Sequence, residues 1–83
     1  MRCIFMCRSL TYAQRAARAL ERAGISGYVR KAPQSISGNG CGYCVSVSYG
    51  REKRAAQILR SENLLQGKIY LEISDSEFRE VSL

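Results

Sequence analysis

Residues Tyr43-Cys44-Val45-Ser46-Val47-Ser48-Tyr49 decide the fold, because apolar and polar side chains alternate along them. A period of two predicts a β-strand, since successive side chains of a strand point to opposite faces of its sheet. We expect Val45 and Val47 to face the core together with Tyr43 and Tyr49, while the serines face solvent. The stretch therefore predicts a half-buried strand.

Three further stretches predict strands on either side of this one. Arg2–Cys7 is a short apolar strand candidate, and Tyr28–Lys31 is a second strand that Pro33 ends. Lys68–Ile73 alternates again. The residues of this last strand that we expect to face inward are Ile69, Leu71 and Ile73.

Two segments place apolar residues at the spacing of an amphipathic helix. The first begins at a cap formed by Ser9 or Thr11 and ends at Gly24. Its expected inward side chains are Leu10, Ala13, Ala17 and Leu20. The second helix covers Arg51–Ser61. Its expected inward side chains are Ala55, Ile58 and Leu59, followed by Leu64 before Gly67.

The order strand, helix, strand, strand, helix, strand predicts an α+β fold. With right-handed crossovers, these elements form a ferredoxin-like βαββαβ sandwich, a four-stranded antiparallel sheet with two helices on one face. Residues 34–42 are expected to form a loop. The 83 residues suit a single domain, 1–83, with a core over about residues 2–73 and a C-terminal tail, 74–83, that the pattern leaves unassigned.

Composition narrows the possible chemistry. Histidine is absent, which excludes histidine-based acid–base catalysis, Ser-His or Cys-His dyads, and zinc sites that need imidazole. Thirteen lysines and arginines against seven acidic residues leave a net charge of +6, so the surface attracts anions. No residue pattern indicates a cofactor.

The apolar stretches are too short for a membrane protein or a secreted one. The longest, Cys3 to Cys7, is far below the roughly 20 residues of a membrane-spanning helix. It is also shorter than the core of a signal peptide. We therefore expect a cytoplasmic protein whose thiols stay reduced.

The four cysteines do not fit one metal site. Cys3 lies roughly 13 Å from Cys7 along an extended strand, too far for both to bind one tetrahedral ion. We expect these two as small buried side chains. In the predicted topology the end of the first strand lies beside the start of the third, which would bring Cys7 near Cys44 and near the loop that carries Cys41.

Cys41-Gly42-Tyr43-Cys44 has the spacing of a redox-active pair, which leaves a dithiol oxidoreductase as one interpretation. Thioredoxin-type pairs precede a helix, however, whereas a strand pattern follows this one. Cys41 sits in a glycine-rich loop, where Arg8 and the start of the first helix would lower the pKa of its thiol. An incidental cysteine at a hairpin tip is the alternative interpretation.

Several of these residues resemble a known family. They are Phe5, the stretch from Ser9 and Thr11 to Ala13, Ala23-Gly24-Ile25, and above all Ser37 to Gly42 with its Cys-Gly pair. The chain resembles the Se/S carrier protein-like family, a small bacterial family, over about residues 2–73. The resemblance implies that Cys41 carries sulfur or selenium and that Gly42 shapes its loop. Cys44 is not part of the family pattern.

The sequence thus predicts a carrier more than a stand-alone enzyme. A Cys41 thiolate would accept the terminal atom of a persulfide or perselenide and pass it on, which requires one nucleophile and no acid–base residue. Its partners would be donor and acceptor proteins, and a basic surface suits acidic ones.

Two other classes of function remain as alternatives. In a nucleic-acid-binding module the helical cations would contact phosphates, but no RNP-like run is present, and a solvated helix face is the favoured interpretation. The cations in question are Arg15, Arg18, Arg22, Lys53, Arg54 and Arg60. In a metal or cluster module, Cys7, Cys41 and Cys44 would need a fourth ligand from another subunit.

Overall fold

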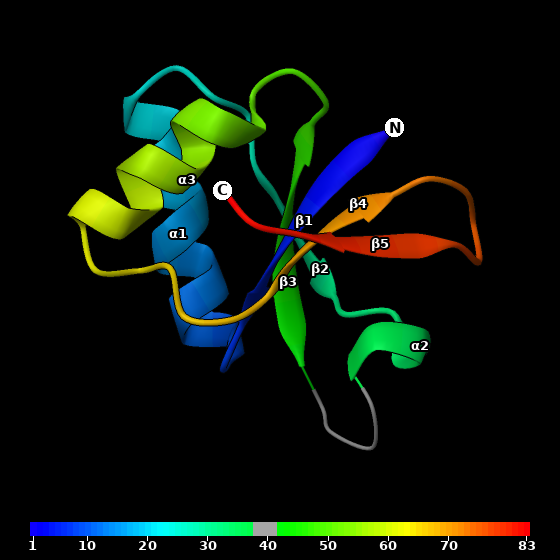
Figure 1. Ribbon diagram of the computed structural model, residues 1–83. Coiled ribbons are helices and arrows are strands. Elements are labelled where there is room, and N and C mark those ends of the chain that lie inside the picture. Colours follow the sequence, from blue (N-terminus) through cyan, green and yellow to red (C-terminus); the bar gives the residue numbers. More distant parts are fainter. Residues whose placement is uncertain (38–41) are drawn as a thin grey trace.

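The computed structural model describes residues 1–37 and 42–83, and within them five strands form one sheet in the order β2-β3-β1-β4-β5 (Figure 1). The strands are β1 (Arg2–Cys7), β2 (Tyr28–Lys31), β3 (Tyr43–Ser48), β4 (Ile69–Glu72) and β5 (Phe78–Val81). The helices of these residues are α1 (Leu10–Arg22), α2 (Gln34–Ser37) and α3 (Glu52–Ser61).

Strand β1 lies at the centre of the sheet. It pairs antiparallel with β3 on one side and with β4 on the other, so Cys3 lies between Val47 and Leu71. Helices α1 and α3 pack side by side on one face of the sheet (Figure 1). Their buried residues share a core with Cys3, Phe5 and Val45.

The α+β class and the antiparallel sheet are confirmed, but the expected four strands and two helices are too few. The tail forms β5, which pairs with β4 through a turn in which the Ile73 amide donates to the Glu77 carbonyl at 2.9 Å. Phe78 packs against one face of the sheet and Val81 against the other. This strand was not predicted because its apolar residues alternate only weakly.

Helix α2 occupies part of the segment that was expected to be a loop. Pro33 directly precedes it, and the Ile36 amide donates to the Pro33 carbonyl at 3.1 Å. Proline is suited to the first turn of a helix because its φ is already helical and the missing N–H has no partner there. The residue that ends the extended chain after β2 thus also starts a helical turn.

The ends of α1 match the sequence prediction. Ser9 is the N-cap, and its hydroxyl accepts from the Tyr12 amide at 3.4 Å. Gly24 follows the helix with a φ of +83°, a left-handed conformation in which glycine is unstrained. The inward face differs in part, because Leu10 is 41% exposed and Ala17 is only half-buried, whereas Ala16 and Ala19, which were not expected there, are buried. The buried residues are Ala13, Ala16, Ala19 and Leu20.

Strand β3 is buried on both faces and not on one. Val45 and Val47 face the helices as predicted, and Tyr43 packs against the same core. Ser46 was expected in solvent but is 1% exposed, because the Arg2 guanidinium lies over it and donates to both its hydroxyl and its carbonyl. Tyr49 was expected to face inward, yet it follows the strand and is exposed.

A second, smaller core lies on the sheet face opposite α1 and α3. Ile4, Ala32 and Cys44 are buried there. Half-buried side chains from α2, β4 and β5 cover them, among them Ile36, Tyr70 and Phe78. Of the other residues that the sequence predicted to be in the core, Leu59 and Ile69 are buried, whereas Leu71 and Ile73 are only half-buried.

Two leucines of α1 test this arrangement against the sequence pattern, which treated them alike. Leu20→Ala should lower the free energy of unfolding by about 2–5 kcal/mol, because Leu20 is fully buried. Leu10→Ala should change it by less than about 0.5 kcal/mol, because Leu10 is exposed. Urea denaturation of both variants measures the difference, and equal losses would contradict the orientation of α1.

Candidate functional site

One end of the sheet carries the residues that the sequence singled out. The register pairs Tyr43 with Cys7 on one side and with Lys31 on the other, so the end of β1 lies beside the start of β3 as predicted. Gly42 precedes Tyr43, and its carbonyl accepts from the Ala32 amide at 2.9 Å. Cys41, the predicted carrier thiol, lies outside the described residues.

This end of the sheet, which we call the loop edge, also holds the start of α1. Arg8 and the cap residue Ser9 directly follow Cys7. Arg8 is exposed, and its backbone amide donates to the Gln66 side chain at 3.4 Å. The helix N-terminus and the Arg8 cation therefore lie at the same edge as Gly42.

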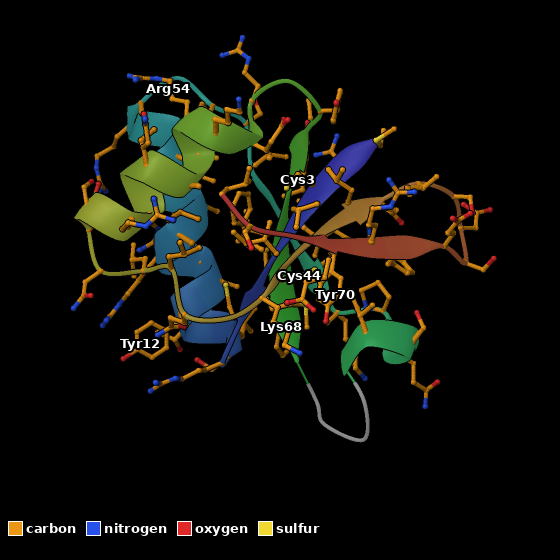
Figure 2. The ribbon with its side chains drawn as sticks, in the orientation of Figure 1. Cys3, Tyr12, Cys44, Arg54, Lys68 and Tyr70 are labelled. Atoms are coloured by element: carbon orange, nitrogen blue, oxygen red, sulfur yellow. The ribbon has the colours of Figure 1, made fainter. Side chains whose placement is uncertain are left out.

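The loop edge is rich in cations. Arg8, Lys31 and Lys68 are all exposed residues of this edge. Lys68 contacts the Glu80 carboxylate at 3.8 Å, but both side chains stay in solvent. Figure 2 places Lys68 at the same end of the sheet as Cys44. A positive field of this kind stabilises anions, including a thiolate.

The segment before β4 is tied closely to β1. The Met6 amide donates to the Lys68 carbonyl at 3.0 Å. At Gly67 a Cβ atom would lie 3.0 Å from the Met6 carbonyl oxygen and 3.1 Å from the Met6 Cβ. A Cβ here would press against Met6, so the absence of a side chain at Gly67 suits the close approach of the Gln66–Lys68 segment to the loop edge.

Cys3 and Cys7 point into the core between the sheet and helices α1 and α3, which we call the helix-side core, as expected of small buried side chains. Cys3 is fully buried and Cys7 is 8% exposed. The Cys7 thiol donates to the Phe5 carbonyl, with the sulfur 3.7 Å from the oxygen. Burial raises the pKa of the Cys7 thiol to about 11. Burial and, to a smaller extent, the negative charge of Glu52 raise the pKa of the Cys3 thiol to about 12. Both thiols are thus protonated at neutral pH.

Cys44 lies at the predicted end of the sheet but on the other face from Cys7. The register pairs it with Met6, and directly paired residues point to the same side of a sheet. The two cysteines therefore lie on neighbouring strands as expected, but their side chains lie on opposite faces of the sheet and do not face each other. Cys44 is fully buried, and burial raises the pKa of its thiol to about 11, with Arg30 lowering the pKa and Glu72 raising it.

These positions weigh against a shared metal site. The proposed metal ligands were Cys7, Cys41 and Cys44, of which Cys7 and Cys44 fall among residues 1–37 and 42–83. The side chains of these two lie on opposite faces of the sheet. In the same residues no three cysteine, aspartate or glutamate side chains lie close enough to hold one ion.

The sheet face opposite α1 and α3, which we call the second face, carries a polar cluster that the sequence did not predict. Arg2 bonds Ser46 and lies over the Tyr28 ring, with its guanidinium carbon 5.1 Å from the ring centre. Beside it, Arg30 contacts the Glu72 carboxylate at 3.1 Å. In the sequence, the only sign of this cluster was a serine inside one predicted strand, Ser46, and an arginine at the start of another, Arg2. The register of β1 against β3 is what brings these two residues together.

The second face does not resemble a surface that stacks nucleic-acid bases. Such sheets present exposed aromatic rings on their central strands. On this face β1 and β3 carry no aromatic residue: Ile4, Cys44 and Ser46 are buried, Arg2 and Met6 are half-buried, and Ser48 is exposed. Of the cations considered for phosphate contacts, Arg15, Arg18, Arg22, Lys53, Arg54 and Arg60 are exposed on α1 and α3, as expected for a solvated helix face.

Comparison with known proteins gives one positive result. The family model described as "Putative Se/S carrier protein-like" matches residues 2–71. The matched segment runs from β1 into β4 and stops before β5. Searches of curated proteins and of solved structures found no match. Among helices of the described residues, none has both the length and the apolar character to cross a lipid bilayer.

The burial of three cysteines predicts their reactivity. In the folded protein near neutral pH, iodoacetamide should label Cys3, Cys7 and Cys44 at least about a hundredfold more slowly than in the unfolded chain, because a raised pKa removes the thiolate. Labelling should accelerate as the pH approaches 11, the pKa of Cys7 and Cys44. Peptide mapping by mass spectrometry measures each site, and rapid labelling of Cys44 in folded protein would contradict its burial.

Proposed function

The chain belongs to the Se/S carrier protein-like family, and from this membership we propose that it carries sulfur or selenium on the side chain of Cys41. The family match covers most of the chain, including the segment in which Cys41 lies. The partners would be proteins that donate and accept the atom. The protein would work in a reducing compartment such as the cytoplasm, where its buried thiols stay free.

The burial of the other three cysteines is the observation that supports Cys41 as the carrier thiol. Cys3, Cys7 and Cys44 are part of the two cores, and burial raises the pKa of each thiol. A nucleophilic cysteine needs the opposite surroundings, with access to solvent and nearby positive charge. Cys41 is the remaining cysteine, and the residue that follows it, Gly42, lies at the cationic loop edge.

The proposed transfer needs no acid–base residue. The Cys41 thiolate attacks the terminal sulfur of a donor persulfide, R–S–SH. A new S–S bond forms to Cys41, the donor's S–S bond breaks, and the donor leaves as the thiolate R–S⁻. With R–S–SeH as donor the same exchange leaves a Cys41–S–SeH group. Attack by an acceptor thiolate on the terminal atom returns Cys41 to its thiolate, so no net oxidant is consumed.

The loop edge suits this exchange in two ways. Arg8, Lys31 and Lys68 would stabilise the thiolate of Cys41 and of the departing donor. Gly42 is held by the Ala32 amide yet carries no side chain, which leaves room for an approaching partner. The cations would thus favour the thiolate form of Cys41, and the glycine would leave the approach to it open.

A dithiol oxidoreductase is the second candidate, because Cys41 and Cys44 have the spacing of a redox pair. A resolving thiol must reach the first sulfur to close a disulfide. Cys44 is fully buried in the second core, and its pKa is raised to about 11, so the carrier function is the better supported of the two.

The two candidates predict different behaviour of two variants. Cys41→Ser should abolish the gain of a sulfur atom from a small-molecule persulfide, because it removes the accepting thiolate. Cys44→Ala should leave the first transfer largely intact, since Cys44 contributes packing and its replacement removes only one buried sulfur atom. Intact-protein mass spectrometry after removal of the donor measures the loading.

Circular dichroism and thermal unfolding of both variants serve as the control for folding. Loading that persists in folded Cys41→Ser would overturn the carrier assignment. Equal loss in folded Cys41→Ser and Cys44→Ala would favour dithiol chemistry instead.

A further inference from the structure

A shallow groove runs between α1 and the chain that follows α3. It is lined by Arg15, Arg18, Arg22, Glu62 and Leu64. The three arginines recur at intervals of three and four residues, so they share one face of α1. At 1.5 Å per residue their row extends about 10 Å along the helix axis.

The charges of the groove are only partly balanced. Arg22 contacts the Glu62 carboxylate at 3.0 Å, and these side chains are 65% and 41% exposed. Arg15 lies over the Tyr12 ring, with its guanidinium carbon 5.6 Å from the ring centre. Among the described residues, no ion pair involves Arg18. Three guanidinium groups against one carboxylate leave an excess of two positive charges in the lining.

We propose that this groove binds an acidic helical segment of a partner protein. Carboxylates at positions i, i+3 or i+4, and i+7 of a helix repeat the spacing of the arginine row, so each can meet one guanidinium. An apolar residue of the same helix can contact Leu64, which is half-buried against the helix-side core. The existing contact between Arg22 and Glu62 shows that a carboxylate fits at the end of the row.

The groove leads toward the loop edge. The row begins beside Tyr12, in the first turn of α1, and that turn follows Cys7, Arg8 and the N-cap Ser9. In Figure 2 Tyr12 lies at the N-terminal end of α1, which follows β1. A helix bound along the row would thus place its protein near the loop edge. That this protein is the donor or acceptor of the carried atom rests on the proposed function.

The lining fits a protein helix better than a nucleic acid. Leu64 adds an apolar contact that a phosphate backbone cannot use. The aromatic ring beside the row, Tyr12, is already covered by Arg15 and so does not offer a face for base stacking.

The test measures binding without any sulfur chemistry. The probe is a fluorescein-labelled helical peptide with glutamates at i, i+3, i+4 and i+7 and one leucine, compared by fluorescence anisotropy with the same peptide carrying glutamines. The folded wild-type protein should bind the glutamate peptide more tightly, and added salt should weaken the complex. The variant R15Q/R18Q/R22Q should bind about fivefold to a hundredfold more weakly, the combined effect expected of three exposed ion pairs.

A matched variant controls for net charge. R51Q/K53Q/R54Q removes the same number of exposed cations from the start of α3, outside the groove, and should keep wild-type affinity. Equal weakening in both variants would overturn the proposal, as would the absence of binding by the wild-type protein. Tighter binding of a labelled single-stranded RNA, lost only in R15Q/R18Q/R22Q, would assign the groove to nucleic acid and also overturn it.

The same experiment separates this inference from the proposed function. Cys41→Ser should bind the glutamate peptide like the wild-type protein, because the thiol takes no part in docking. R15Q/R18Q/R22Q should still load sulfur from a small-molecule persulfide, which needs no docking surface. Peptide binding that disappears in folded Cys41→Ser would overturn the groove assignment, whereas a failure of loading alone would affect only the proposed function.

Discussion

Burial of β1 on both of its faces is the constraint on which the rest of the structure depends. Cys3 and Phe5 lie in the helix-side core, while Ile4 between them is buried on the second face. Because β1 also pairs along both edges, a slip of one residue against β3 or β4 would exchange every side chain between two different cores. This requirement sets the register, and the register in turn sets the loop edge where Cys7 meets Tyr43.

The two faces of the sheet are closed by different means. On one face, alanines let α1 and α3 approach closely, and a buried leucine or phenylalanine contributes about 1.5–3 kcal/mol. On the other, Arg2 and Arg30 extend their long side chains across neighbouring strands to Ser46 and Glu72. The partly exposed Arg30–Glu72 pair contributes about 1 kcal/mol at most, so packing dominates the stability of both faces.

This division separates the chemistry of the chain from its fold. Three thiols serve as small apolar side chains, and burial raises the pKa of each so that they stay protonated. Most of the cations, in contrast, are exposed, at the loop edge and along α1 and α3. A carrier that exchanges an atom between proteins would benefit from this arrangement, because its reactive end can change its covalent state without disturbing either core.

Local pattern in the sequence was sufficient for most of the secondary structure. Alternation identified β3 to within one residue, proline and glycine marked the ends of β2 and α1, and the Cys-Gly pair beside a glycine-rich loop indicated the family. What depends on residues far apart in the chain could be decided only by the tertiary structure. Ser46 is buried because Arg2 from another strand covers it, and Cys7 and Cys44 lie on opposite faces because the register pairs Cys44 with Met6. Strand β5 forms because β4 offers it an unpaired edge, which no periodicity within residues 74–83 could reveal.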